Sequence, residues 1–233
     1  MYIQSAQYYD AIYSFKDYEK ECGQLEDIIE EHLRSGGRRL LDVACGTGGH
    51  LQFLSRQFRV EGVDVNEEFI TIARERYPDL PFYCGDMRDF VAEGAYDVVT
   101  CLFSAIGYMT TLPDLNAAVA HMAGHLLPGG LLIVEPWIAP EEWRSHTVHL
   151  QTVDQPDLKI ARMVTSKTEG RLSSMDMHHL VGTPEGTEHF MERHELLLAT
   201  REEMKAAFIH AGLETTYDVR GLTGRGLFIG LKN

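Results

Sequence analysis

Apolar runs alternate with amphipathic stretches along the first half of this chain. Apolar residues at helical spacing predict helices over about 17–34, 49–57, 67–76 and 114–126. The apolar runs between them predict five buried strands, which are Arg39–Ala44, Arg59–Asp64, Pro81–Cys84, Tyr96–Leu102 and Leu131–Glu135. Strands that alternate with helices in this way indicate an α/β fold built on a doubly wound, mostly parallel sheet.

The pattern changes near Thr147. Four stretches with strand character follow one another, joined by short turns, over 147–154, 158–168, 171–181 and 187–197. We interpret them as an antiparallel β insertion, 147–197, within a single domain that spans 1–233. A helix over 201–211 and two strands over 213–219 and 226–231 then close the chain and bring the main sheet to seven strands.

A glycine-rich turn, Asp42–His50, follows the first predicted strand. In a doubly wound sheet, this turn lies at the carboxyl end of the strand, where ligands bind. Glycines let the backbone approach a ligand closely because they have no Cβ atom. Asp64 ends the second strand at a position typical of ribose binding, and Gly85-Asp86-Met87 follows the third. The three features together predict a nucleoside-binding site.

The turn lacks the features that bind phosphates. A dinucleotide site has the spacing G-x-G-x-x-G/A, but Gly46 and Gly48 are followed by Gly49, His50 and Leu51. No G-x-x-x-x-G-K-[ST] loop is present either. A nicotinamide-dependent dehydrogenase is therefore disfavoured, and a nucleoside ligand without phosphates fits better.

These motifs resemble those of the class I S-adenosylmethionine-dependent methyltransferases, with matches at Asp42 to Gly48, at Asp64 and at Gly85-Asp86-Met87. The resemblance implies a Rossmann-like methyltransferase fold and S-adenosylmethionine as the cofactor. It also implies that the cofactor is held by Asp42, Ala44, Gly46, Gly48, Asp64, Val65, Asp86, Met87, Phe103 and Ser104. Within this set, Asp64 would accept both ribose hydroxyls, and Ser104 would lie toward the transferred methyl.

Three further segments resemble a narrower group. Tyr9–Tyr13, Glu135–Trp137 and Gly224–Gly230 look like the N-methyltransferases that act on nucleotide-linked amino-deoxysugars in antibiotic biosynthesis. This resemblance implies a small-molecule substrate, a dTDP-linked amino sugar. Two alternatives stay open at this point. The chain could methylate another small amine, hydroxyl or carbon acceptor, or it could bind the cofactor without catalysing a reaction.

Methyl transfer from a sulfonium needs positioning more than acid or metal chemistry. The leaving sulfur is neutral, so we expect no metal, but an amine must be neutral to attack. Tyr13 is the leading catalytic candidate and His121 the second, although a histidine on a polar helix face is also an ordinary surface residue. Predicted substrate contacts come from Tyr9, Trp137, His179 and Arg225. Arg225, flanked by two glycines, suits an anion such as a phosphate.

Charge and composition narrow the choice of partners. The formal net charge of −14 opposes binding to nucleic acid. No apolar run approaches the roughly 20 residues that span a bilayer, and the first residues do not resemble a secretory signal. The four cysteines are scattered, as expected for reduced thiols. We therefore predict a cytoplasmic enzyme, a monomer or homodimer, with no nucleic-acid or membrane partner.

Overall fold

The structure is a computed structural model that describes residues 4–233, so the first three residues of the predicted domain lie outside the described part. Its body is a seven-stranded sheet in the order β10-β11-β5-β4-β1-β2-β3. These strands are β1 (Arg39–Val43), β2 (Arg59–Asp64), β3 (Phe82–Cys84), β4 (Tyr96–Cys101), β5 (Leu126–Val134), β10 (Leu213–Asp218) and β11 (Leu227–Lys232). Six of these strands run in one direction and β11 runs in the opposite direction, which confirms the predicted fold.

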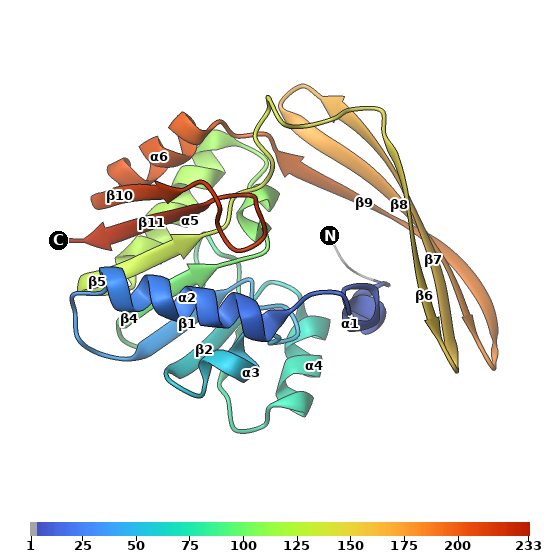
Figure 1. Cartoon of the computed structure of the whole chain (residues 1–233), viewed down its shortest axis with the longest axis horizontal. Helices are drawn as coiled ribbons and strands as arrows, with labels where there is room; N and C mark the ends of the chain where they lie inside the picture. The colour runs from blue at the N-terminus through green and yellow to red at the C-terminus, as the bar shows by residue number, and fades with distance from the viewer. Residues whose placement is uncertain (1–3) are drawn as a thin grey trace.

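Helices cover both faces of this sheet (Figure 1). On one face lie α2 (Tyr18–His32), α3 (Leu51–Leu54) and α4 (Glu67–Arg76), and on the other α5 (Leu112–Gly124) and α6 (Arg201–His210). Successive strand residues point to opposite faces, so Leu40 packs with α2 and α3 while Leu41 packs toward α5. The central strands β1, β4 and β5 are largely buried on both faces and are rich in apolar residues, as the sequence pattern indicated.

The bounds of two predicted elements differ from the sequence-based prediction by more than two residues. Strand β5 begins at Leu126, five residues before the expected start at Leu131. Pro128-Gly129-Gly130, whose residues favour turns, lies inside this strand, and the register with β4 shifts between Tyr96 and Val98. A Cβ atom at Gly130 would lie 2.9 Å from the Asp97 carbonyl oxygen, so glycine permits the close backbone approach. Helix α3 is shorter than the expected 49–57 because the chain turns after Leu54.

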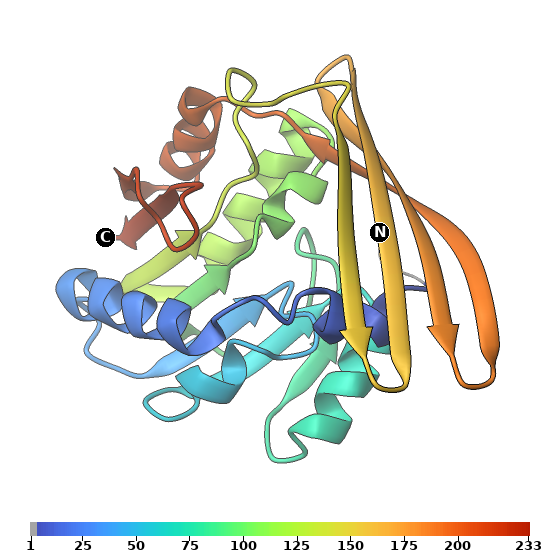
Figure 2. The ribbon, with the colours of Figure 1, turned by 45° about the vertical axis from the view of Figure 1, so that its right-hand side comes forward.

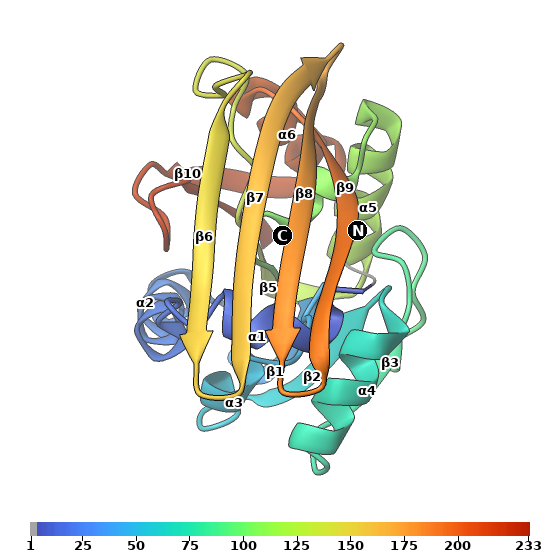
Figure 3. The same cartoon turned by 90° about the vertical axis from the view of Figure 1, so that its right-hand side faces the viewer.

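The predicted insertion forms a second, four-stranded antiparallel sheet in the order β6-β7-β8-β9. Its strands are β6 (Val148–Gln155), β7 (Leu158–Glu169), β8 (Leu172–Thr183) and β9 (Gly186–Leu197). Figure 3 faces this sheet and shows it standing in front of the body. The sheet is long and stands away from the helices, so its inner face needs another partner.

That partner is the N-terminal segment, which the sequence patterns did not identify as helical. It contains η1 (Ala6–Tyr8) and α1 (Tyr9–Ile12) and lies between the second sheet and the body (Figure 2). Ile12 and Tyr13 pack in one apolar cluster with Phe190 of the second sheet. The segment therefore closes the space between the two sheets.

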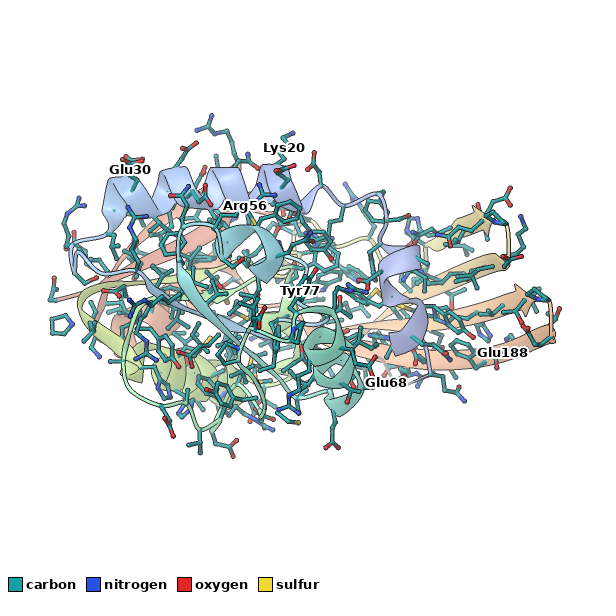
Figure 4. The ribbon with its side chains drawn as sticks, turned by 90° about the horizontal axis from the view of Figure 1, so that it is seen from below. Lys20, Glu30, Arg56, Glu68, Tyr77 and Glu188 are labelled. Carbon is teal, nitrogen blue, oxygen red and sulfur yellow. The ribbon has the colours of Figure 1, made fainter. Side chains whose placement is uncertain are left out.

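Polar contacts fasten this segment on both sides. Asp10 accepts a hydrogen bond from the Thr47 hydroxyl at 2.8 Å and pairs with Arg76 at 2.5 Å. On the other side, the Tyr8 hydroxyl donates to Glu188 at 2.8 Å. Figure 4 shows Glu188 on the second sheet, across the N-terminal segment from Tyr77 of the body.

Candidate active site

A cavity of about 890 Å³ lies where the body, the N-terminal segment and the second sheet meet. The carboxyl ends of the parallel strands supply one wall, as in other doubly wound sheets. Of the sixteen candidate cofactor, catalytic and substrate residues that the sequence suggested, these ten border it: Tyr9, Tyr13, Ala44, Gly46, Asp64, Val65, Asp86, Met87, Phe103 and Ser104. Two further predicted substrate residues, Trp137 and Arg225, border it too. Of the sixteen residues named in all, four remain outside.

The glycine turn forms the cofactor end of the cavity. Ala44 and Gly46 have φ angles of 60° and 56°, in the left-handed region that glycine favours. The Gly46 N–H donates to Asp64 Oδ2 at 2.9 Å, and the Asn66 N–H donates to Asp64 Oδ1 at 2.8 Å. Burial raises the pKa of the Asp64 carboxyl despite these bonds. Each carboxylate oxygen keeps a second acceptor site, so Asp64 can still accept two ribose hydroxyls.

Asp86 and Met87 lie farther along the same edge. Asp86 is held by Arg88, whose Nε and Nη2 atoms approach its carboxylate at 2.9 and 2.7 Å. The Arg88 guanidinium lowers the pKa of Asp86 and also reaches Asp114 at 2.9 Å. Met87 is buried beside them. An apolar face next to a fixed carboxylate suits a purine base that needs stacking and an edge contact.

Asp42 and Gly48 belong to the glycine turn but do not border the cavity. Asp42 is buried, accepts a hydrogen bond from the Thr100 hydroxyl at 2.7 Å, and has its pKa raised to about 6 by burial. A Cβ atom at Gly48 would lie 3.1 Å from the Tyr77 ring. These residues support the shape of the turn, and their direct contact with the cofactor stays a prediction.

The other end of the cavity gathers residues from distant parts of the chain. The Tyr13 ring lies edge-on to Phe103, with ring centroids 5.2 Å apart. Arg225 Nη1 donates to Ser104 Oγ at 3.0 Å, and its guanidinium carbon lies 5.4 Å from the ring centres of both Phe103 and Trp137. A cation, a hydroxyl and aromatic faces therefore surround one space.

Arg162 is a cavity residue that sequence reasoning missed. It lies on β7, is 8% exposed, and its Nη1 atom donates to the Tyr13 hydroxyl oxygen at 3.0 Å. Its guanidinium also lies over the Tyr13 ring, 5.0 Å from the centroid. The alternation of residues along β7 places position 162 on the inner face of the second sheet. This alternation is the signal in the sequence that could have identified Arg162. That the inner face meets Tyr13 could not be read from the pattern.

Lys16 and Glu21 were also missed. Both border the cavity, and the Lys16 ammonium pairs with Glu21 while lying 4.3 Å from the Phe103 ring centre. His50 Nε2 approaches Glu21 Oε2 at 2.8 Å. The hydrogen bonds from His50 and Lys16 lower the pKa of Glu21 although burial opposes them. This network lies beside the glycine turn, where a zwitterionic methionyl group would need partners of both charges.

Tyr108 and His194 form another buried contact at the cavity that no motif suggested. The Tyr108 hydroxyl lies 2.6 Å from His194 Nδ1, and Glu192 Oε2 lies 3.7 Å from His194 Nε2. Burial lowers the pKa of the His194 imidazole. Tyr108 borders the cavity, whereas His194 is fully buried on β9. The contact joins η2 (Ala105–Tyr108) of the body to the second sheet.

His121 and His179 lie outside the cavity. His121 is on α5, where its Nε2 atom lies 2.9 Å from the Phe90 carbonyl oxygen and its ring packs edge-on to Phe90. His179 is fully buried within the second sheet and stacks on Phe190 at 4.8 Å. Burial lowers the pKa of His179 to about 4. The structure thus gives neither of these predicted site residues access to a ligand in the cavity.

Comparison with known proteins shows clear relatives. A family model described as a methyltransferase domain matches residues 40–130. The chain is 39% identical over 230 residues to the dTDP-3-amino-3,6-dideoxy-alpha-D-glucopyranose N,N-dimethyltransferase of Streptomyces fradiae, over 97% of this chain and 90% of that protein. The crystal structure of DesVI from Streptomyces venezuelae matches with a TM-score of 0.92 at 38% identity, over 100% of both chains.

A second solved structure contains the cofactor. CalS10, an amino pentose methyltransferase from Micromonospora echinaspora involved in calicheamicin biosynthesis, was solved with bound S-adenosylmethionine. It matches with a TM-score of 0.87 at 37% identity, over 100% of this chain and 98% of that one. The similarity therefore includes the second sheet as well as the body.

Proposed function

The chain belongs to the class I S-adenosylmethionine-dependent methyltransferases, and we propose that it methylates the amino group of a dTDP-linked amino-deoxysugar. One observation carries the substrate part of the proposal. Arg225 brings a guanidinium to the cavity between the Phe103 and Trp137 rings, in a chain whose net charge is −14. A cation at that place favours an anionic acceptor such as a nucleotide-linked sugar.

The dimensions of the cavity support an acceptor of this size. Ligand sites in proteins usually have volumes of about 300–1,000 Å³, so about 890 Å³ lies near the upper end of that range. Asp64 and Arg225 mark the nucleoside end and the anion end. Phe103 and Ser104 follow β4 and lie beside Arg225, where the amine and the methyl donor would meet.

The reaction is an in-line displacement. When bound, the cofactor supplies a methyl group on a positively charged sulfur, which leaves as a neutral thioether. The amine nitrogen forms the new bond with its lone pair and must lose a proton before a second methyl can be added. Tyr13 would orient this amine. Arg162 donates to the Tyr13 hydroxyl oxygen, which fixes the position of this hydroxyl at the cavity.

Positioning and exclusion of water would then supply most of the rate enhancement. The N-terminal segment covers the cavity, and Tyr9 and Tyr13 present aromatic faces to it. We propose no metal role. Among residues 4–233, no three His, Cys, Asp or Glu side chains group as metal ligands would. Activity should persist in excess chelator, and restoration by Mg²⁺ after a loss would contradict this.

The proposal is tested with a panel of acceptors. The purified protein is incubated with S-adenosylmethionine and a dTDP-linked 3-amino-deoxysugar, its 4-amino isomer, the same sugar without the nucleotide, and a hydroxyl acceptor. Mass spectrometry then counts the methyl groups added. We expect a dimethylated product only from nucleotide-linked amines. Turnover of the hydroxyl acceptor alone would favour the second candidate, and cofactor binding without turnover of any acceptor would favour a non-catalytic module.

Further predictions concern membranes, the location of the protein and its oligomeric state. No helix within residues 4–233 is long and apolar enough to cross a membrane. A cytoplasmic location and a monomeric or homodimeric state stay predictions, and sedimentation of the purified protein would decide between the two states.

A further inference from the structure

Glu135 lies beside the cavity without bordering it. It follows the last residue of β5, is fully buried, and belongs to the Glu135-Pro136-Trp137 segment noted in the sequence. Both of its carboxylate oxygens are engaged. Oε2 accepts the Phe103 N–H at 2.7 Å, and Oε1 accepts the Thr223 hydroxyl. A carboxylate is costly to bury unless it is paired in this way, so these two bonds explain how the fold tolerates it.

The hydrogen bond between Phe103 and Glu135 stabilises a turn with an unfavourable backbone conformation. Phe103 and Ser104 have φ angles of 51° and 64°, which non-glycine residues rarely adopt. The Ser104 hydroxyl donates to the Pro136 carbonyl oxygen at 2.7 Å, next to the Phe103–Glu135 bond. Two consecutive left-handed residues persist only where their surroundings hold them, and here residues 135 and 136 do so.

The hydrogen bond between Thr223 and Glu135 fixes the loop that carries Arg225. This loop, residues 219–226, joins β10 to β11, and its residues Thr223 and Arg225 both border the cavity. Thr223 is tied to Glu135, and Arg225 is tied to Ser104 at 3.0 Å. Because β5 lies between β4 and β11 in the sheet, Glu135 is placed to reach both loops.

We propose that Glu135 is a positioning residue for substrate binding, which fixes the Arg225 loop against the Phe103–Ser104 turn. The inference rests on the proposed role of Arg225 as the partner of the substrate anion. Without the carboxylate, Thr223 and the Phe103 N–H lose their acceptors. The substrate would then have to order Arg225 when it binds. Substrate affinity would therefore fall by more than cofactor affinity.

The first test compares Glu135→Leu with Glu135→Gln. Glutamine can accept from Phe103 with its carbonyl oxygen and donate to the Thr223 hydroxyl with its amide, so it can keep both contacts. We expect Glu135→Leu to raise KM for the dTDP-amino sugar by about 10- to 100-fold, the value of hydrogen bonds to a charged group, with kcat less affected. Glu135→Gln should recover most of this loss. Cofactor affinity, measured by calorimetry, should fall by much less than substrate affinity in both variants.

The second test uses Thr223 and decides the matter if Glu135→Leu does not fold. Thr223→Val removes the hydroxyl at constant shape, and Thr223→Ser keeps it. We expect KM to rise for the valine variant and to recover in the serine variant. In a double-mutant cycle, Thr223→Val should add little to Glu135→Leu, because both changes break the same contact, whereas it should keep its full effect in the Glu135→Gln background, where the contact is retained.

The outcomes separate this inference from the proposed function. If Arg225→Ala leaves KM unchanged, the anion role of Arg225 is wrong. If Arg225→Ala raises KM while folded Glu135→Leu and Thr223→Val do not, only the positioning role of Glu135 is overturned. Equal effects of Thr223→Val and Thr223→Ser, or an equal loss of cofactor affinity and substrate affinity in Glu135→Leu, would also overturn it.

Discussion

The two ends of the cavity are built in different ways. At the cofactor end, the glycine turn and Asp64 come from consecutive strands and are joined by short-range contacts such as Gly46 to Asp64. At the substrate end, Tyr13 meets Arg162, and Ser104 meets Arg225, across more than a hundred residues of chain. The cofactor end is thus a local motif, whereas the substrate end exists only after the N-terminal segment, the second sheet and the C-terminal loop have assembled.

This difference makes the two ends separable by mutation, and the largest effect should come at the cofactor end. Asp64→Ala removes the acceptor for the ribose and also the acceptor for the Gly46 and Asn66 N–H groups. We expect S-adenosylmethionine binding to weaken by about 1.5–3 kcal/mol or somewhat more. Calorimetry measures this directly. Unchanged affinity in a folded variant would remove Asp64 from the cofactor site.

At the substrate end, Arg225→Ala should raise KM for the nucleotide sugar by about 10- to 100-fold, which corresponds to the loss of charge-assisted hydrogen bonds. Cofactor affinity should change less than KM, because the contacts of Arg225 are with Ser104, Phe103 and Trp137 and not with the glycine turn or Asp64. Arg220 offers a matched control. It lies on the same loop, its side chain is 90% exposed, and it approaches only Asp218 at 3.9 Å. Arg220→Ala should leave KM unaltered. If Arg220→Ala and Arg225→Ala raised KM equally, the effect would come from the positive charge of the loop and not from a specific contact of Arg225.

Tyr13→Phe should have a smaller effect because it keeps the ring that packs on Phe103. We expect a loss of about 10- to 100-fold in kcat/KM, below the upper range of general-base effects. The loss should shrink at higher pH, where more of the amine arrives neutral. Tyr8→Phe, which removes a hydroxyl outside the cavity, is the control. A loss above about 10⁴-fold at every pH would instead make Tyr13 an obligatory group.

The smallest effect on catalysis is expected at His179, which the structure buries away from the cavity. His179→Phe should leave KM nearly unchanged but alter stability in acid. The pKa of His179 is lowered from 6.5 to about 4 in the folded state, so the unfolded chain binds the extra proton first as pH falls. Stability is therefore present above pH 6.5 and is lost as pH falls toward 4.

The phenylalanine variant removes this loss, so its melting temperature should fall less between those two pH values than that of the unchanged protein. His178→Phe, on the exposed face of the same strand, is the control. A large rise in KM for His179→Phe would return this residue to the substrate site and weaken the contrast between the two ends.

Secondary structure was predictable wherever a local pattern repeats. The bounds of β2 and α4 match the prediction, and the four strands of the insertion lie within about two residues of their expected positions. The errors fell where local and tertiary requirements differ. The Pro128–Gly130 segment has turn residues, yet it continues β5 because Leu126 pairs with Tyr96. The short helix α1 has no periodicity to detect and is held by contacts with both sheets.

The sequence by itself determined the sheet, the β insertion and the glycine turn beside Asp64, because each depends on residues close together along the chain. Only the tertiary structure decided which side chains complete the site. It brought Arg162 and Lys16 to the cavity and placed His121 and His179 outside it. The physical reason is that a hydrophobic pattern specifies the face on which a residue lies, whereas the neighbour opposite that face is specified by how separate layers pack.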